Sequence, residues 1–408
     1  MKKIFNSYNY YKIYFWILVG TLSLGQLQRV ELPGLLLGVN FYLHEVLLFI
    51  FIVLVSFFNF SDYTDFIRSK YLKIQQKNFP VEIFFIVLLL ASFVFNLIFN
   101  FDLIAVLYFV RLCLYLSFTM IVLFSIEKKK IQVEYLHFQL FSIGIFSLLL
   151  GFLQYTFITD TRFLSVLGWD DHYARMIGTY FDPGFTGIIL VLTLILGLSH
   201  TLLQNKRFQA LATAIFSWGV VLTFSRASYV SLVVALICIG VYKYKKILST
   251  QKVVLVTSVL IITLVILAPK PMGEGVDLLR TASITARTSS ITQQLSTTTN
   301  GSFFIGNGLF FTQNSSQITT IIPSHSRIPD NLFVTVFLAG GIFALLSFIW
   351  IVLKYVRILS ASNYYLLAVV LAVLFHSQFN NSVLQPFVLF VFLNSCVVLS
   401  RSDYKLKL

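Results

Sequence analysis

The sequence predicts an all-α, polytopic integral membrane protein with about twelve transmembrane helices, both termini in the cytoplasm and long loops on the outer face. Three observations predict it. Of the 408 residues 58% are hydrophobic and 11% charged, against roughly 25% charged in an ordinary soluble domain. Apolar runs long enough to cross a bilayer recur along the whole chain. Lysine and arginine gather in alternate connections between those runs. A soluble enzyme, a disordered chain and a collagen-like fibre are excluded.

The apolar runs are expected to be helices, because within lipid only a helix or a closed barrel satisfies the backbone. The first run is predicted to be an uncleaved span, since Gln26, Gln28 and Arg29 follow it in place of a cleavage site of small residues. The runs between 209 and 242 are short, which favours tilted or irregular helices. The twelve predicted spans are 13–28, 34–59, 81–100, 102–125, 136–158, 184–204, 209–224, 228–242, 252–268, 331–353, 363–380 and 383–400.

The basic residues orient these spans. With the N-terminus inside, 21 of the 30 lysines and arginines fall in cytoplasmic segments, eight in outer segments and Arg111 within a span. An odd number of spans would break this alternation. Eight acidic and eight basic residues cancel on the outer side, while 21 basic and six acidic residues leave +15 on the cytoplasmic side, facing anionic lipid; Asp102 at the end of a span brings the total to +14. Membrane lipid is therefore the expected partner of the basic charge, and no nucleic acid is needed.

Two outer loops are long, one over 159–183 and a larger one over 269–330 that is rich in Ser, Thr, Gly and Asn. Loops of this length in a compact protein usually carry function. Within the larger loop, residues 277–296 could form an amphipathic helix on the membrane surface. Because the sequence shows no internal repeat and no appended soluble domain, residues 1–408 are expected to form a single membrane domain.

Ionisable groups at membrane depth are costly, and they are usually paired or functional. Glu45 lies about 11 residues into the second predicted span and Arg111 about 10 into the fourth, both counted from the outer side. An ion pair that orients the two helices is the simpler interpretation, and a proton or substrate relay is the alternative. A polar group near the outer end of the eleventh span either lines a cavity or caps helices; its members are His376, Gln378, Asn380, Asn381 and Gln385.

Four clusters on the predicted outer face carry most of the chemistry, and they span 175–184, 223–228, 305–309 and 325–331. They supply arginines and few acids. Arginine makes bidentate contacts to phosphate, so several arginines near lipid headgroups suit a lipid-linked phosphate or pyrophosphate. Asp330 or His325 could accept a proton from an attacking hydroxyl. The alternative is that each arginine only snorkels to the interface.

In this order, the clusters resemble the O-antigen polymerase and O-antigen ligase superfamily, which comprises Wzy-type polymerases and their ligase relatives. The resemblance covers roughly 170–350. Two departures are Asp330-Asn331, where ligases commonly carry His-Asn, and Gly184, where a second Asn is usual after the proline. The motifs that carry the resemblance are RMIGTYFDPGFTGIIL (175–190), TFSRASYVSLVVAL (223–236), FFIGNGLFF (303–311), DNLFVTVFLAGGIFALLSF (330–348) and Arg287, which precedes the Gly-x-Gly segment.

The resemblance implies glycosyl transfer at the outer face of a bacterial cytoplasmic (inner) membrane, in the synthesis of a polysaccharide such as that of lipopolysaccharide. A polymerase would move a glycan from undecaprenyl pyrophosphate onto another lipid-linked repeat unit, with chain length set by a separate co-polymerase. The alternatives are a ligase that uses a lipid A core as acceptor and, further away, a transporter or flippase. No cofactor or metal is expected. The implied catalytic residues are Arg175, Arg226, Asp330 as base and His325 as second candidate base, and the implied substrate-binding residues are Arg287, Arg327, Asn331 and Asp182.

Overall fold

A computed structural model gives the fold, and it describes residues 8–30, 40–75, 81–200, 205–243, 249–269, 274–278, 281–296, 298–311 and 328–401. Over these ranges the chain is almost entirely helical, as predicted. The strands among them are β1 (Arg29–Val30) and β2 (Phe41–Tyr42), which pair with each other. The described part of the chain is therefore an all-α structure.

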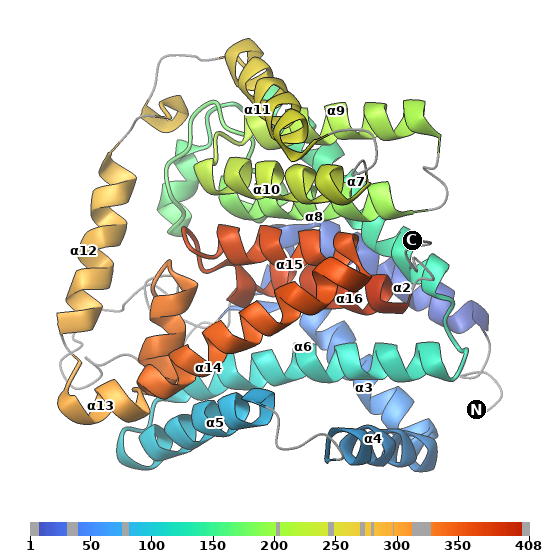
Figure 1. The fold of residues 1–408 in the computed structure, drawn as a ribbon, viewed down its shortest axis with the longest axis vertical. Coiled ribbons are helices and arrows are strands. Elements are labelled where there is room, and N and C mark those ends of the chain that lie inside the picture. The colour runs from blue at the N-terminus through green and yellow to red at the C-terminus, as the bar shows by residue number, and fades with distance from the viewer. Residues whose placement is uncertain are drawn as a thin grey trace. The chain divides into compact units, whose positions relative to one another are not determined.

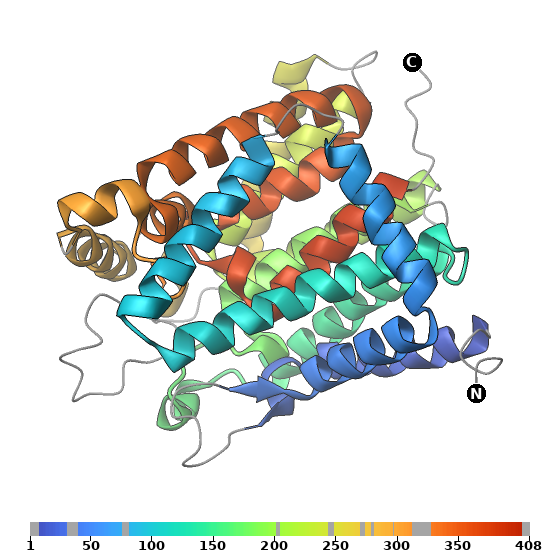
Figure 2. The same cartoon turned by 90° about the horizontal axis from the view of Figure 1, so that it is seen from below.

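Six helices in the described ranges are long and apolar enough to cross a membrane, which supports a polytopic membrane protein. They are α5 (Val81–Phe99), α6 (Leu103–Glu127), α7 (Val133–Phe157), α10 (Arg226–Lys243), α11 (Thr250–Leu267) and α14 (Leu332–Ser362). A seventh crossing is possible where α3 (Leu43–Phe58) meets α4 (Phe60–Gln75), a pair bent by 98° (Figure 2).

The remaining predicted spans also contain helices, but these are shorter. They are α2 (Tyr8–Ser23), α8 (Pro183–Ser199), α9 (Lys206–Leu222), α15 (Tyr364–His376) and α16 (Pro386–Arg401). Twelve crossings and the inside position of both termini stay predictions. The segment predicted to be the larger outer loop contains α12 (Ala282–Ser296) and α13 (Asn300–Ile305), so the helix predicted over 277–296 is present from 282 onward. Its place on a membrane surface also stays a prediction. Single 3-10 turns lie at η1 (Gly25–Gln28), η2 (Arg162–Leu167), η3 (Gly178–Tyr180), η5 (Glu274–Val276) and η7 (Ser382–Leu384).

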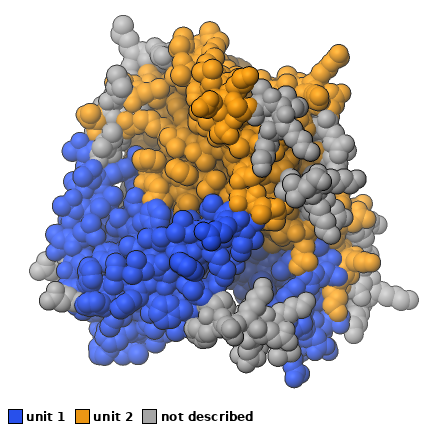
Figure 3. All heavy atoms as spheres, in the orientation of Figure 1, with its two compact units in different colours: residues 1–5, 30–127, 282–358 blue, residues 6–29, 128–281, 359–408 orange. Residues whose placement is uncertain are grey.

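The chain divides into two compact units (Figure 3). Unit 1 contains residues 30–127 and 282–358, and unit 2 contains residues 6–29, 128–281 and 359–408. Each unit combines stretches that are far apart in the sequence. The division therefore offers no point at which the chain could be cut into contiguous domains, and the single membrane domain expected for residues 1–408 stays a prediction.

Helix α8 lies at the centre of unit 2, where it contacts α7, α9, α10, α15 and α16 (Figure 1). Apart from Phe185, every residue of α8 is buried. The helix starts at Asp182-Pro183, an N-cap followed by a proline in the first turn, which is a favoured way to begin a helix. Gly187 lets a neighbour come close, because a Cβ there would lie 2.2 Å from Ser228 Oγ.

Unit 1 is organised around α3, α5, α6 and the main part of α14. Phe93 of α5 stacks on Phe109 of α6, and Phe85 packs against Phe348 of α14. Lys354 of α14 forms an ion pair with Glu82 at the start of α5, with 2.6 Å between Nζ and Oε1. These contacts tie the part of α14 that follows residue 341 to α5, while Asp330 and Asn331 precede the part before that residue.

Candidate functional site

Arg175 is buried, and its guanidinium binds main-chain oxygens at the end of α9. Its Nε donates to the carbonyl of Thr223 (3.0 Å) and its Nη2 to that of Phe224 (3.1 Å). A positive charge at the C-terminus of a helix interacts favourably with the helix dipole. Snorkelling would place the guanidinium in water, and with 7% of Arg175 exposed the snorkelling interpretation does not fit this arginine.

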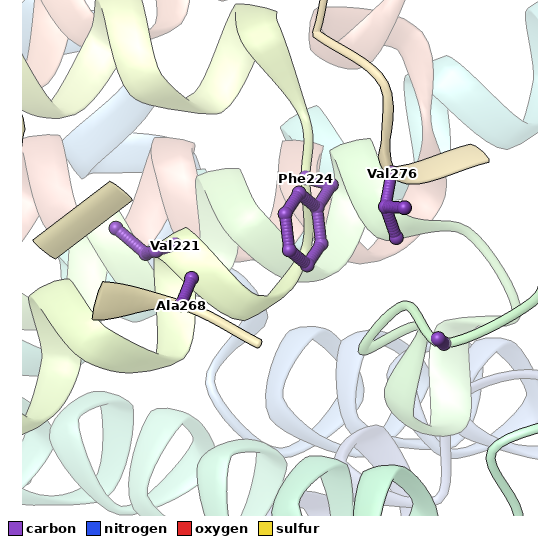
Figure 4. Packing of buried hydrophobic residues seen from close by; sticks show 5 residues of the cluster. Val221, Phe224, Ala268 and Val276 are labelled. Atoms are coloured by element: carbon purple, nitrogen blue, oxygen red, sulfur yellow. The ribbon is translucent and has the colours of Figure 1, made fainter. Parts of the chain in front are cut away.

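The turn between α9 and α10 is held from a second side by Phe224. This residue has a positive φ of 48°, so the right-handed helical path of α9 does not continue through it. The ring is fully buried in a cluster with Val221, Ala268 and Val276 (Figure 4), and Ala174 also belongs to this cluster. The Arg175 guanidinium and the Phe224 ring together fix the turn that leads to Arg226.

Arg226 is the first residue of α10 and is half-buried. Its Nη1 donates to the carbonyl of Leu278, 3.3 Å away. The Ser225 hydroxyl accepts from the amide of Ser228 (3.4 Å), the pattern of a helix N-cap. Arg175 and Arg226 thus bring two positive charges to one turn, beside the amide end of α10, where a helix favours anions.

Asp182 lies in the same unit and caps α8, with Oδ1 accepting from the amide of Phe185 at 2.7 Å. Burial raises the pKa of the Asp182 carboxyl, while the positive charge of Arg175 opposes that rise. The structure thus brings three of the predicted site residues, Arg175, Arg226 and Asp182, into one region of unit 2.

Gly184 is packed against three polar side chains, one from the residue that caps α8 and two from the end of α15 and the turn after it. A Cβ at this position would lie 2.8 Å from Asn380 Nδ2, 3.0 Å from Asp182 Oδ1 and 3.7 Å from His376 Cε1. No side chain fits there unless these groups move. The departure from the usual Asn at position 184 therefore has a packing reason, and the polar group near the end of α15 lies beside the start of α8.

The remaining predicted site residues that the structure describes belong to unit 1. Arg287 of α12 pairs with Asp330, with 3.5 Å between Nε and Oδ2, and both side chains are about one third exposed. The Asn331 side chain caps α14 by accepting from the amide of Val334 at 3.1 Å. His325 and Arg327 lie outside the described residues, so their roles stay predictions.

The Gly-x-Gly segment of the third cluster packs on a break in α14. Gly341 has φ 72° and ψ −170°, which interrupts the helix. The amides of Asn307 and Gly308 donate to the carbonyls of Leu338 (2.7 Å) and Ala339 (3.2 Å), just before the break. The two backbones lie close together, because a Cβ at Gly341 would lie 2.2 Å from the carbonyl oxygen of Phe304 and a Cβ at Gly306 would lie 2.5 Å from that of Ala339.

Glu45 and Arg111 form the predicted ion pair, with 2.6 Å between Oε1 and Nε. Helix α3 starts later than the predicted span, which begins at residue 34, and the depth of Glu45 in a membrane stays a prediction. Helix α3 begins at Leu43, so Glu45 lies in its first turn, where it accepts from the amide of Tyr42 at 3.2 Å. The Arg111 guanidinium also lies over the rings of Tyr42 and Tyr108. The pair joins the start of α3 to α6.

Among the described residues, no group of three or more His, Cys, Asp or Glu side chains could hold a metal ion. Cys113, Cys238 and Cys396 are not joined in disulfides. No protein-family model, curated protein or solved structure matches this chain. The case for a function therefore rests on the chemistry of the clusters described above.

Proposed function

We propose that this protein is a glycosyltransferase of the outer face of a bacterial cytoplasmic membrane, and specifically a polysaccharide polymerase. Its donor is a glycan on undecaprenyl pyrophosphate, and its acceptor is a second lipid-linked repeat unit. The observation that carries the proposal is that the Arg175 guanidinium binds the turn between α9 and α10, directly before Arg226. The motif resemblance over 170–350 supports it.

The reaction requires that an acceptor hydroxyl attack the anomeric carbon of the donor. A glycosidic C–O bond forms, the bond to the pyrophosphate oxygen breaks, and the hydroxyl proton passes to a base. Charge grows on the departing pyrophosphate, and fixed positive groups stabilise that charge in the transition state. In this proposal Arg226 contacts the pyrophosphate. Arg175 adds its charge to the same turn and holds the turn in place.

Asp330 is the proposed base, and Arg287 and Asn331 belong to its surroundings. The ion pair with Arg287 sets the direction of the Asp330 carboxylate. Asn331, which caps α14, and Asp182, which caps α8, are the proposed contacts to the sugar hydroxyls. Carboxylates and amides are suited to this role because each accepts hydrogen bonds from hydroxyl groups.

The test is reconstitution of the purified protein in liposomes with synthetic undecaprenyl-pyrophosphate repeat units, without added metal, and separation of products on a gel. The wild type is expected to give a ladder of lengthening products. R226A and R175A should each lose about 10²–10³ in rate, the usual effect of removing one group that stabilises transition-state charge.

R162A is the matched control. Arg162 lies in the same outer loop as Arg175, but its side chain is 60% exposed and pairs with Asp160 at 2.6 Å. R162A should make a normal ladder, and a normal ladder from R226A would overturn the assignment. Transfer onto added lipid A core without a ladder would make the protein a ligase. Movement of the lipid-linked unit across the bilayer without bond formation would make it a flippase.

A further inference from the structure

His376, the last residue of α15, is fully buried and hydrogen-bonded on both sides of its ring. Its Nε2 lies 3.2 Å from the hydroxyl of Ser228 in α10, and its Nδ1 forms a close hydrogen bond with the hydroxyl of Ser382 in η7. The neutral ring has one donor and one acceptor nitrogen. It therefore joins two hydroxyl groups that the sequence separates by more than 150 positions.

Ser228 lies in the first turn of α10, two residues after Arg226, and its hydroxyl contacts three other residues. Its hydroxyl lies 2.9 Å from that of Ser225 and 3.3 Å from the carbonyl of Gly184 at the start of α8. Ser225 is the N-cap that precedes Arg226. The two serines thus flank Arg226 on either side, and the contacts of Ser228 reach both α8 and His376.

The network is buried, so each of its hydrogen bonds replaces a bond to water that these groups cannot make. Ser228, Ser382 and His376 each have an exposed fraction of 0%. Leaving one such group without a partner costs the full desolvation of that group, on the order of 1–3 kcal/mol. Gly187 makes the arrangement possible, since a Cβ there would overlap Ser228. The first turn of α10 is consequently held in one position.

We propose that His376 is a positioning residue that fixes the first turn of α10, and with it Arg226, through its hydrogen bond to Ser228. His376 touches neither substrate nor reacting atoms in this role. The effect of His376 on catalysis rests on the proposed function. The effect of His376 on the stability of the hydrogen bonds in residues 225–229 is independent of that function and is measured separately.

Two substitutions separate positioning from general support of the fold. Glutamine places its amide near the position of the His Nε2 atom and can still reach Ser228. Asparagine places its amide near Nδ1 and can still reach Ser382. If the contact to Ser228 is the one that matters, H376Q should behave like the wild type and H376N should not.

His137 provides the control. It is a second buried histidine of unit 2, and its Nε2 lies 2.8 Å from the carbonyl of Leu196 and 3.3 Å from Ser199 Oγ, at the other end of α8. H137N removes a comparable imidazole but leaves the contacts of α10 intact. H376N and H137N are both expected to lower the melting temperature. Only the effects on residues 225–229 and on turnover therefore distinguish positioning of α10 from general support of the fold.

The first measurement is amide hydrogen exchange of the full-length protein in detergent, followed over 223–230. H376N and S228A should speed exchange in this segment by about tenfold, the equivalent of one hydrogen bond to a buried group. H376Q and H137N should stay within about threefold of the wild type. Unchanged exchange in H376N, or equal changes in H376N and H137N, would overturn the proposal.

The second measurement is polymer formation in liposomes, with kcat and KM determined separately. H376N should lower kcat about tenfold with H376Q restoring it, and the losses in H376N and R226K should combine to less than their product. If the wild type makes no polymer but the exchange pattern is as expected, the proposed function fails and the positioning role stands. If the wild type polymerises and H376N equals it in both measurements, the positioning role fails and the function stands.

Discussion

Replacement of Gly341 by alanine tests the break in α14. At φ 72° and ψ −170° the backbone lies in a region that only glycine occupies readily, and strain there costs about 1–3 kcal/mol. An alanine Cβ would also lie 2.2 Å from the carbonyl oxygen of Phe304 and 2.9 Å from the amide nitrogen of Ile305. Both neighbours are main-chain atoms, so they cannot rotate out of the way.

G341A has two ways to respond, and both are costly. If the break persists, the protein carries the strain and the overlap. If α14 straightens, the carbonyls of Leu338 and Ala339 pair within the helix, as in any unbroken helix, and the 304–308 segment loses two hydrogen bonds at about 1 kcal/mol each. Either route should destabilise the protein by about 2–3 kcal/mol.

The assay is thermal unfolding in detergent, combined with amide exchange at Asn307 and Gly308. The control is G301A in α13, where a Cβ meets no atom within 4 Å, so stability should change little or rise by up to about 1 kcal/mol. G341A should lower the melting temperature and expose both amides to exchange. Equal melting temperatures for G341A and G301A, with both amides still protected, would refute the packing argument.

Three further predictions concern charge. E45A leaves the guanidinium of Arg111 buried without its carboxylate partner and should lower the free energy of unfolding by about 3–5 kcal/mol, measured by thermal unfolding. The double variant E45A/R111A should lower it by less. Equal losses in the two variants would argue against a stabilising ion pair. Because the pKa of Asp182 is raised, its protonated form is favoured by folding, and this contribution to stability is present at low pH and lost as the pH rises through the raised pKa. D182N keeps the N-cap, so it should melt at or above the wild type at neutral pH and lose that advantage in acid, and a difference independent of pH would contradict the raised pKa. Finally, EDTA should leave the polymer ladder of the reconstituted protein unchanged, and a ladder that EDTA abolishes and Mg²⁺ restores would point to a metal.

The helical architecture could be predicted because hydropathy alone identifies apolar helices in membrane proteins. The ion pair between Glu45 and Arg111 could be predicted because charges in an apolar environment need partners. The late start of α3 could not be predicted in the same way. Aromatic residues such as Phe41 and Tyr42 occur in strands as well as in membrane helices, so the sequence gives no sign that these two are extended before α3 begins.

The contacts that build the site could not be read from the sequence. Ser228 and His376 are separated by 148 positions. The chain has many serines, so the sequence does not show which of them His376 contacts. Nothing in the sequence around Gly341 indicates that the backbone of Phe304 lies against it. Such pairings depend on how helices are arranged in space, which a single sequence does not record.

The central position of α8 has a consequence for biogenesis. The chain is synthesised from its N-terminus, so α8 is made before four of the five helices that surround it, of which α15 and α16 come last. Until residues 364–401 emerge, part of the α8 surface has only lipid or other proteins to contact. Unit 2 is therefore completed only after residues 282–358 of unit 1 have been synthesised, and a chain that stalls between α11 and α15 should be degraded as an incomplete protein.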